Sequence, residues 1–349
     1  MIEIDGSSYS GSGAVVRQSV AYAALTGQPL HVIRARAARP RPGLAHQHVC
    51  AVRALCDLVG GTVEGASVGS RELVFHPGTR LPAGQYRWDV GTAGSVTTLA
   101  LALLPVLAQT RRGVDVELHG GLFQDFAPSY FHVKHVMLPL LAGMGLLADA
   151  QMLRPGYVPR GEGVLRLVVR RGPSSLRPVV FPHAGRVQRV WGISLASHLS
   201  QRQVASRMAE AARRELAAAG YREVDIDELD DTTAVQPGAA FALFADRASG
   251  ARLGADRAGA PRRRAEAIGV STARQLLQAI QAGATLDRFA ADQVVPFAAL
   301  AAGASRVRIP ERTEHIETGA WLAKTFLGAE VHIEDQVLTV AGRPIAAIT

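Results

Sequence analysis

Short runs of alternating apolar and polar residues recur along the chain and predict strands, and most are followed by segments with the apolar spacing of a helix. The predicted strands are residues 1–5, 30–33, 62–64, 72–76, 85–90, 114–119, 187–195, 224–226, 240–245, 306–309 and 329–334. The predicted helices are residues 15–25, 47–59, 96–107, 130–144, 201–219, 271–282, 289–301 and 320–327. The order of strand, small-residue or polar loop, helix and strand therefore repeats, which indicates α/β layers with helices on one face of a sheet.

One such unit, residues 305–331, has the most suggestive chemistry. Pro310 ends its first strand because proline has no N–H for a strand ladder. The polar residues 311–315 then predict a turn, with the following helix closed by Gly328. His315 is thereby expected in a strand-to-helix loop, where sheet folds present functional groups. Taken alone, a solvated histidine is the simpler interpretation.

The pattern changes after about residue 170. A long amphipathic helix, an acidic run at residues 227–231 and a loop-like stretch at 247–264 follow one another. We interpret residues 185–268 as an inserted small α/β domain, with residues 1–184 and 269–349 as the core. The alternative is that the helix at residues 271–282 closes the insert.

Composition favours a protein with sizeable apolar cores, because 48% of the 349 residues are hydrophobic. The longest apolar run, residues 96–108, is interrupted by polar residues and a proline, and a bilayer span needs about 18–20 apolar residues. We therefore expect no membrane partner. Cys50 and Cys56 are too few for a zinc site and poorly spaced for a disulfide, so a reducing, cytoplasmic location is expected.

The net charge of +8 comes from arginine, since Lys134 and Lys324 are the only lysines. Guanidinium groups stay charged and pair bidentately with phosphate. A nucleotide or nucleic acid is therefore favoured as the partner. A generic basic protein is the alternative.

Three segments could carry chemistry. Small-residue loops at residues 6–13 and 91–95 precede helices and would let a phosphate approach backbone N–H groups, although tight turns are the simpler explanation of each loop taken alone. Four arginines in residues 34–41 precede Gln47 and His48, which suits an anion or a solvated loop. Phe289 precedes Asp292 and Gln293; its ring could stack on a base or lie in the core.

Six segments in this order resemble motifs of the RNA 3′-terminal phosphate cyclase family over nearly the whole chain. They are residues 34–48 (the family's IRAGR…PGL…QH), 91–95 (GSAGS), 120–128 (GGT…P), 156–163 (G(F/Y)YPxGGG), 291–293 (ADQ) and 315–318 (HxxTN). The resemblance implies an α/β fold of repeated βαβαββ units, of the RNA cyclase and enolpyruvyl-transferase type, with a smaller inserted α/β domain.

The resemblance also implies an activity. ATP and Mg²⁺ or Mn²⁺ would be used to convert an RNA 3′-terminal phosphate to a 2′,3′-cyclic phosphate, through a covalent histidine–AMP and an RNA adenylate. The partner would be RNA with a 3′-phosphate end, because only RNA carries the attacking 2′-OH. A neutral imidazole is a suitable nucleophile at neutral pH. The resemblance gives no oligomeric state.

Matched by position, His315 takes the place of the nucleophile. The residues that match the nucleotide site are Phe289, Asp292, Gln293, Pro128, Thr92, Ala93, Gly94 and Ser95. The residues that match groups holding RNA phosphates are Arg17, Arg34, Arg39 (with Arg36 as its alternative), Gln47 and His48.

The chain departs from the family pattern in its first loop. Ser10 stands where a metal-binding Glu is expected, and Ala14 where Gln is expected. The metal ligands are therefore unknown, with Glu314 and Asp125 as candidate substitutes. Gly319 replaces the Asn of HxxTN. These departures keep open a catalytically weakened or inactive RNA-binding relative. Shared architecture alone suggests enolpyruvyl transfer to a small acid.

Overall fold

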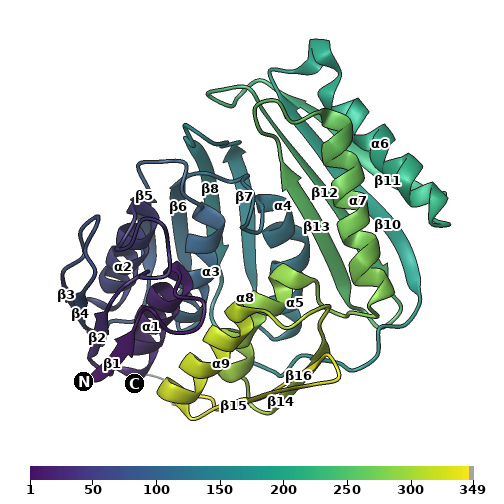
Figure 1. Ribbon diagram of the computed structural model, residues 1–349. Coiled ribbons are helices and arrows are strands. Elements are labelled where there is room, and N and C mark those ends of the chain that lie inside the picture. The colour runs from purple at the N-terminus through teal and green to yellow at the C-terminus, as the bar shows by residue number, and fades with distance from the viewer. Residues whose placement is uncertain (346–349) are drawn as a thin grey trace.

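The computed structural model describes residues 1–345, so residues 346–349 of the predicted core lie outside the described residues. The described residues form four sheets of four strands each, with helices packed between and over them (Figure 1). Three of these sheets belong to βαβαββ units, which confirms the predicted fold class.

The first two units have the same strand order. The first contains β1 (Ile2–Asp5), α1 (Gly13–Thr26), β2 (Leu30–Ile33), α2 (His46–Val59), β3 (Thr62–Glu64) and β4 (Leu73–His76). The second contains β5 (Gly84–Asp89), α3 (Val96–Leu107), β6 (Val114–Gly120), α4 (Tyr130–His132), η1 (Val133–Met137), α5 (Leu138–Gly143), β7 (Ala148–Arg154) and β8 (Gly163–Val169). Their orders are β1-β2-β4-β3 and β5-β6-β8-β7, with the first two strands parallel and the others antiparallel.

The third unit repeats this order but is split along the chain. It contains β9 (Val180–Phe181), α8 (Arg288–Ala299), β14 (Ala304–Arg308), α9 (Glu314–Leu327), β15 (Glu330–Glu334) and β16 (Val337–Ala341). Strand β9 pairs in parallel with β14, although more than a hundred residues separate β9 from α8. The Thr285 hydroxyl donates to the Phe181 carbonyl at 3.0 Å, so the two ends of the intervening segment lie together.

The intervening segment forms the fourth sheet and its helices. It contains β10 (Val187–Ser197), η2 (Ser200–Arg202), α6 (Val204–Ala218), β11 (Val224–Asp231), β12 (Gly238–Arg247), β13 (Arg252–Ala258) and α7 (Ala265–Gln281). The strand order is β11-β10-β12-β13, and α6 and α7 cover the sheet with an apolar core of their own (Figure 1). The insert boundaries, residues 185 and 268, remain a prediction. The packing of α7 on α6 favours the alternative that this helix closes the insert.

Several local predictions were wrong. The acidic residues 227–231 continue edge strand β11, where exposed charges discourage pairing with another chain. The stretch 247–264, predicted as a loop, contains β13. Strands β7, β8, β9 and β16 were not predicted. The helix predicted at 130–144 contains a π-helical turn, η1, just before Pro139, whose missing N–H interrupts the helical ladder.

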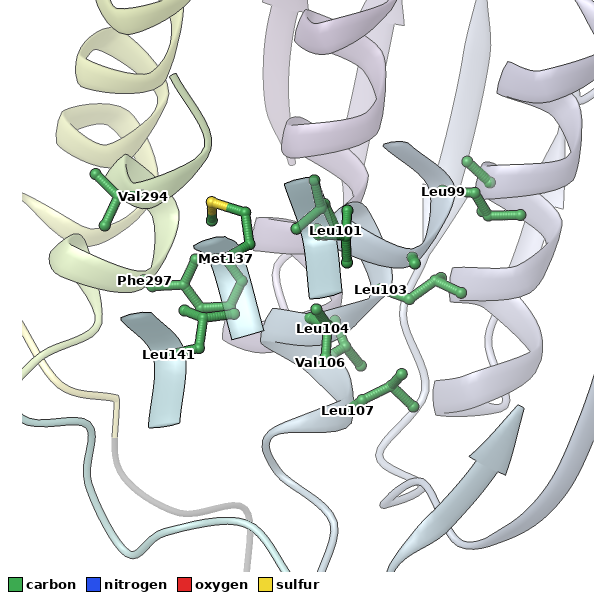
Figure 2. Close-up of a cluster of buried hydrophobic side chains, with 14 of the residues drawn as sticks. Leu99, Leu101, Leu103, Leu104, Val106, Leu107, Met137, Leu141, Val294 and Phe297 are labelled. Carbon is green, nitrogen blue, oxygen red and sulfur yellow. The ribbon is translucent and has the colours of Figure 1, made fainter. Parts of the chain in front are cut away.

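Helix α3 lies at the centre of the core, where α1, α2 and α8 pack around it. It is buried on nearly all sides, which suits its mostly apolar sequence. Figure 2 shows its leucines and valine beside side chains of the second and third units. The labelled residues are Leu99, Leu101, Leu103, Leu104, Val106, Leu107, Met137, Leu141, Val294 and Phe297. Among residues 1–345, no helix combines the length and the apolar character that crossing a membrane requires.

Candidate active site

The N-terminal ends of α8 and α9 are joined by Asp292 and Thr313. The Thr313 hydroxyl caps α9 by accepting the N–H of Ile316 at 3.1 Å, and it donates to the buried Asp292 carboxylate. One turn along α9, the Thr318 hydroxyl lies 2.9 Å from the Ser10 hydroxyl. Helix α9 is therefore fixed both to α8 and to the loop that precedes α1.

The N-terminal ends of α1, α2 and α3 meet in a similar way. A Cβ atom at Gly13 would lie 1.9 Å from Nε2 of His48, so only glycine fits at the start of α1. Next to His48, the Gln47 side-chain oxygen accepts the N–H of Ser95 at 2.9 Å. The Ser95 hydroxyl in turn caps α3 by accepting the N–H of Thr98 at 3.1 Å. Because helix N-termini carry partial positive charge, this gathering of helix ends favours an anion.

His315 lies in the first turn of α9 and not in the predicted loop, because Thr313 starts the helix earlier than expected. Burial lowers the pKa of His315, and the nearby cations of Arg17, Arg39 and Arg288 lower it further. The imidazole is therefore neutral at physiological pH. It lines a narrow cavity of about 30 Å³ together with side chains of α1, α3 and α8, which include Arg17, Gln18, Thr98 and Gln293.

His48 is a second neutral imidazole next to this cavity. Its Nδ1 accepts the N–H of Ala45 at 3.0 Å, which leaves the proton on Nε2, facing Gly13. Burial, with the charges of Arg17, Arg36 and Arg39, lowers the pKa of His48 to about 2. Burial and the Arg36 charge lower the pKa of Arg17 only to about 10, so its guanidinium stays charged.

The arginines predicted to hold RNA phosphates are placed differently from one another. Arg17 and Arg39 are close enough to His315 to affect its pKa. Arg34 instead pairs with Asp5, with an Nε–Oδ1 distance of 2.9 Å. Arg36 donates to backbone carbonyls of its own loop. The phosphate-binding roles of these residues remain predictions.

Three of the five N–H groups in the loop of residues 91–95 already have acceptors, the Ser95 N–H among them. The N–H of Gly91 donates to Asp89 at 2.7 Å, and that of Gly94 to the Thr92 hydroxyl at 3.2 Å. Within the described residues, the N–H groups of Thr92 and Ala93 have no acceptor. These two amides are the ones that a phosphate could use.

Phe289 and the segment that contains Pro128 both contact His132. The Phe289 ring is half-buried and contacts the His132 ring edge-on, with centroids 5.7 Å apart. The N–H of His132 donates to Ser129, the residue after Pro128, at 3.3 Å. Pro128 itself is buried, and its carbonyl accepts the Thr97 hydroxyl at 2.7 Å. An adenine could reach both rings only if the loop of residues 121–128 moved.

The chain supplies few ligands for a divalent metal. No cluster of three or more His, Cys, Asp or Glu side chains is found within residues 1–345. Asp125 is bound by Arg263, with distances of 3.0 and 2.6 Å, and Ser10 bonds to other hydroxyls. Glu314 is the exposed carboxylate nearest in sequence to His315. Mg²⁺ is compatible with this, since it often binds through one carboxylate, phosphates and water.

Several residues of this site were missed in the sequence. Thr313 was assigned to a turn, although a Thr before an apolar-periodic segment is a helix-start signal. Arg288 directly precedes Phe289 of the predicted adenine-binding segment and belongs to no motif, yet its charge lowers the pKa of His315. The Gln18 side-chain oxygen lines the His315 cavity and is buried without a partner among the described residues. Gly319 lets α9 approach Val295 of α8, which a Cβ atom would contact at 3.1 Å.

We expect Asp292→Asn to stabilise the protein above about pH 6. Burial raises the pKa of Asp292 to about 6 against the lowering effect of the Thr313 hydrogen bond. The charged carboxylate therefore destabilises the folded protein. This destabilisation is absent below the ordinary carboxyl pKa and complete above the raised pKa. The gain should reach up to about 3 kcal/mol at alkaline pH and vanish at acidic pH.

Urea unfolding at several pH values measures this gain in unfolding free energy, with Asp225→Asn, at an exposed carboxylate, as the control. Parallel pH profiles for wild type and Asp292→Asn would contradict the expectation.

Comparison with known proteins shows similarity over nearly the whole chain. The family model described as RNA 3′-terminal phosphate cyclase matches residues 8–333. The chain is 40% identical over 336 residues to the RNA 3′-terminal phosphate cyclase of Methanothermobacter thermautotrophicus, covering 96% of this chain and 97% of that protein. It is 36% identical to that of Methanopyrus kandleri, covering 99% of each. The enolpyruvyl transferase NikO from Streptomyces tendae aligns with this chain at a TM-score of 0.40 and 10% identity, over 99% of this chain and 49% of that one.

Proposed function

Because the chain belongs to the RNA 3′-terminal phosphate cyclase family, we propose that it uses ATP to convert an RNA 3′-terminal phosphate to a 2′,3′-cyclic phosphate. One observation supports this most strongly. His315, held neutral, lies in the first turn of α9, and the charges of Arg17, Arg39 and Arg288 are close enough to lower its pKa. A nucleophile and a source of positive charge are therefore adjacent, as phosphoryl transfer requires.

In this proposal the reaction has three steps. A ring nitrogen of His315 attacks the α-phosphorus of ATP, forming a P–N bond while the P–O bond to pyrophosphate breaks. An oxygen of the RNA 3′-phosphate then attacks the same phosphorus, which frees the imidazole and forms an anhydride. The 2′-OH attacks the RNA phosphorus, AMP leaves, and the hydroxyl proton passes to solvent.

The side chains would serve these steps by position. Arg17 and Arg39 would stabilise the charge that develops on the phosphates, and the free amides of Thr92 and Ala93 would bind the AMP phosphate. Asp292 and Phe289 would bind the adenosine. Mg²⁺ or Mn²⁺, arriving with the ATP phosphates, would supply Lewis-acid stabilisation, with Glu314 as the nearby carboxylate.

The test is to incubate the protein with ATP, Mg²⁺ or Mn²⁺ and an RNA labelled at its 3′-phosphate. Cyclisation protects the label from phosphatase, so an ATP-dependent rise in protected label is expected. No protected label with either metal would overturn the proposal. Tight, salt-sensitive RNA binding without this product would instead identify a non-catalytic relative, the alternative that the hydroxyl cluster at Ser10 favours.

A further inference from the structure

A basic groove lies where the insert meets the core. Its volume is about 550 Å³. One wall is the core loop of residues 157–159, and the other is formed by the start of α6 and the segment that leads into α7. Five arginines line it: Arg202, Arg207, Arg262, Arg263 and Arg264.

The arginines exceed the acidic groups that neutralise them. Arg207 and Arg264 share one carboxylate, that of Glu266, at 2.8 and 3.5 Å. Arg263 pairs with Asp125. The guanidinium groups of Arg202 and Arg262 are exposed and have no carboxylate partner among the described residues. A groove with two uncompensated guanidinium groups attracts a polyanion.

The core segment at the groove is adjacent to the loop of residues 91–95. Gly161 packs so closely on that loop that a Cβ atom would lie 2.7 Å from the Ala93 Cα. The adjacent N–H of Arg160 donates to Gln236 of the insert at 3.2 Å, and Gln236 donates to the Val158 carbonyl at 2.9 Å. Residues 158–161 therefore lie between the loop of residues 91–95 and the insert and contact both.

An exposed aromatic ring lies at the same junction. Phe126 is 99% exposed, and its backbone has a left-handed φ of +66°, both unfavourable for phenylalanine. Its loop is fixed on one side by the Asp125–Arg263 pair at the groove and on the other by the Thr97–Pro128 hydrogen bond at α3. The ring is thus held in solvent between the active site and the groove.

We infer that Phe126 and this arginine groove bind the single-stranded nucleotides that precede the RNA 3′ end, an inference that rests on the proposed function. Arg202 and Arg262 contact phosphates, and Phe126 stacks on a base. An acidic protein segment would match the arginines, but an exposed ring beside a basic groove is the combination that binds unpaired bases and their phosphates. A duplex would keep its bases stacked on one another and gain nothing from Phe126.

The experiment measures the affinity of a short single-stranded RNA with a 3′-phosphate, by fluorescence anisotropy over a range of salt concentrations. Phe126→Ala should weaken binding roughly tenfold, and Phe126→Tyr should not. The double variant Arg202→Ala/Arg262→Ala should reduce the slope of log affinity against log salt by about 1.4. Arg214→Ala, at an exposed arginine of α6 outside the groove, is the matched control.

Wild-type affinity and salt slope in all of these variants would overturn the inference and assign the groove to another partner, such as an acidic protein. Nucleotide transfer from ATP to the protein in the absence of RNA should be unchanged, because the groove does not contact His315. If wild type makes no cyclic phosphate while RNA binding still depends on Phe126 and the arginines, the proposed reaction fails and the RNA surface stands.

Discussion

The His315→Ala variant should form no covalent nucleotide adduct with α-labelled ATP, and its RNA cyclisation should fall by roughly a thousandfold or more. The alanine has no atom that can attack phosphorus, and a neighbouring water is a poor substitute because its product is not held in place. The label is measured on denatured protein at neutral and acidic pH, since a phosphoramidate bond is lost in acid.

The matched control is His332→Ala, which removes a histidine with a side chain 72% exposed on β15, away from the helix N-termini. It should label like wild type. Because burial lowers the pKa of His315, wild-type labelling should also persist at about pH 6.5, where half of a free imidazole is protonated. A full label in His315→Ala, with a folded circular dichroism spectrum, would remove His315 from the mechanism.

The Asp287→Ala variant should lose about 3–5 kcal/mol of unfolding free energy, the cost of breaking a buried ion pair from one side. Asp287 is buried and caps α8 by accepting the N–H of Ala290 at 3.0 Å. It also lies 2.9 Å from Nε2 of the fully buried His132 and accepts the N–H of Gly254, in insert strand β13, at 2.9 Å. Alanine leaves all three of these groups without a partner.

Chemical unfolding followed by circular dichroism measures this loss. Asp287→Asn keeps one oxygen, which can accept the N–H of Ala290 or that of Gly254 but not both, and so should lose less than Asp287→Ala. Asp225→Ala breaks the exposed pair with Arg189 and should change stability by less than about 1 kcal/mol. If Asp287→Ala were no less stable than Asp225→Ala, the contact between α8, α4 and β13 would not contribute to folding.

The regular elements were predictable where their periodicity was undisturbed. Helix α1 and strand β2 each have an uninterrupted apolar pattern and were found within two residues of the predicted bounds. Strand β13 was missed because several of its residues, among them Gly254, Ala255 and Asp256, are of types that are uncommon in strands. Strand β9 is too short for any period to be visible, and only its pairing with β14 defines it.

The candidate site was only partly predictable from the sequence. His315, Arg17 and Gln293 could be named from motifs, and the structure brings them to one cavity. The link between Thr313 and Asp292 joins side chains on two helices, so no sequence spacing reveals it. The pairing of Arg34 with Asp5 was also invisible, because it depends on β1 and β2 lying side by side.

The hydrogen bond from Thr285 to the Phe181 carbonyl has a consequence for how this architecture can vary. Since the chain leaves and re-enters the third repeat at almost the same point, the whole intervening module could be exchanged, enlarged or replaced by a short connection without stretching the repeat. A chain of this architecture can therefore keep its three repeats unchanged while the intervening module diversifies.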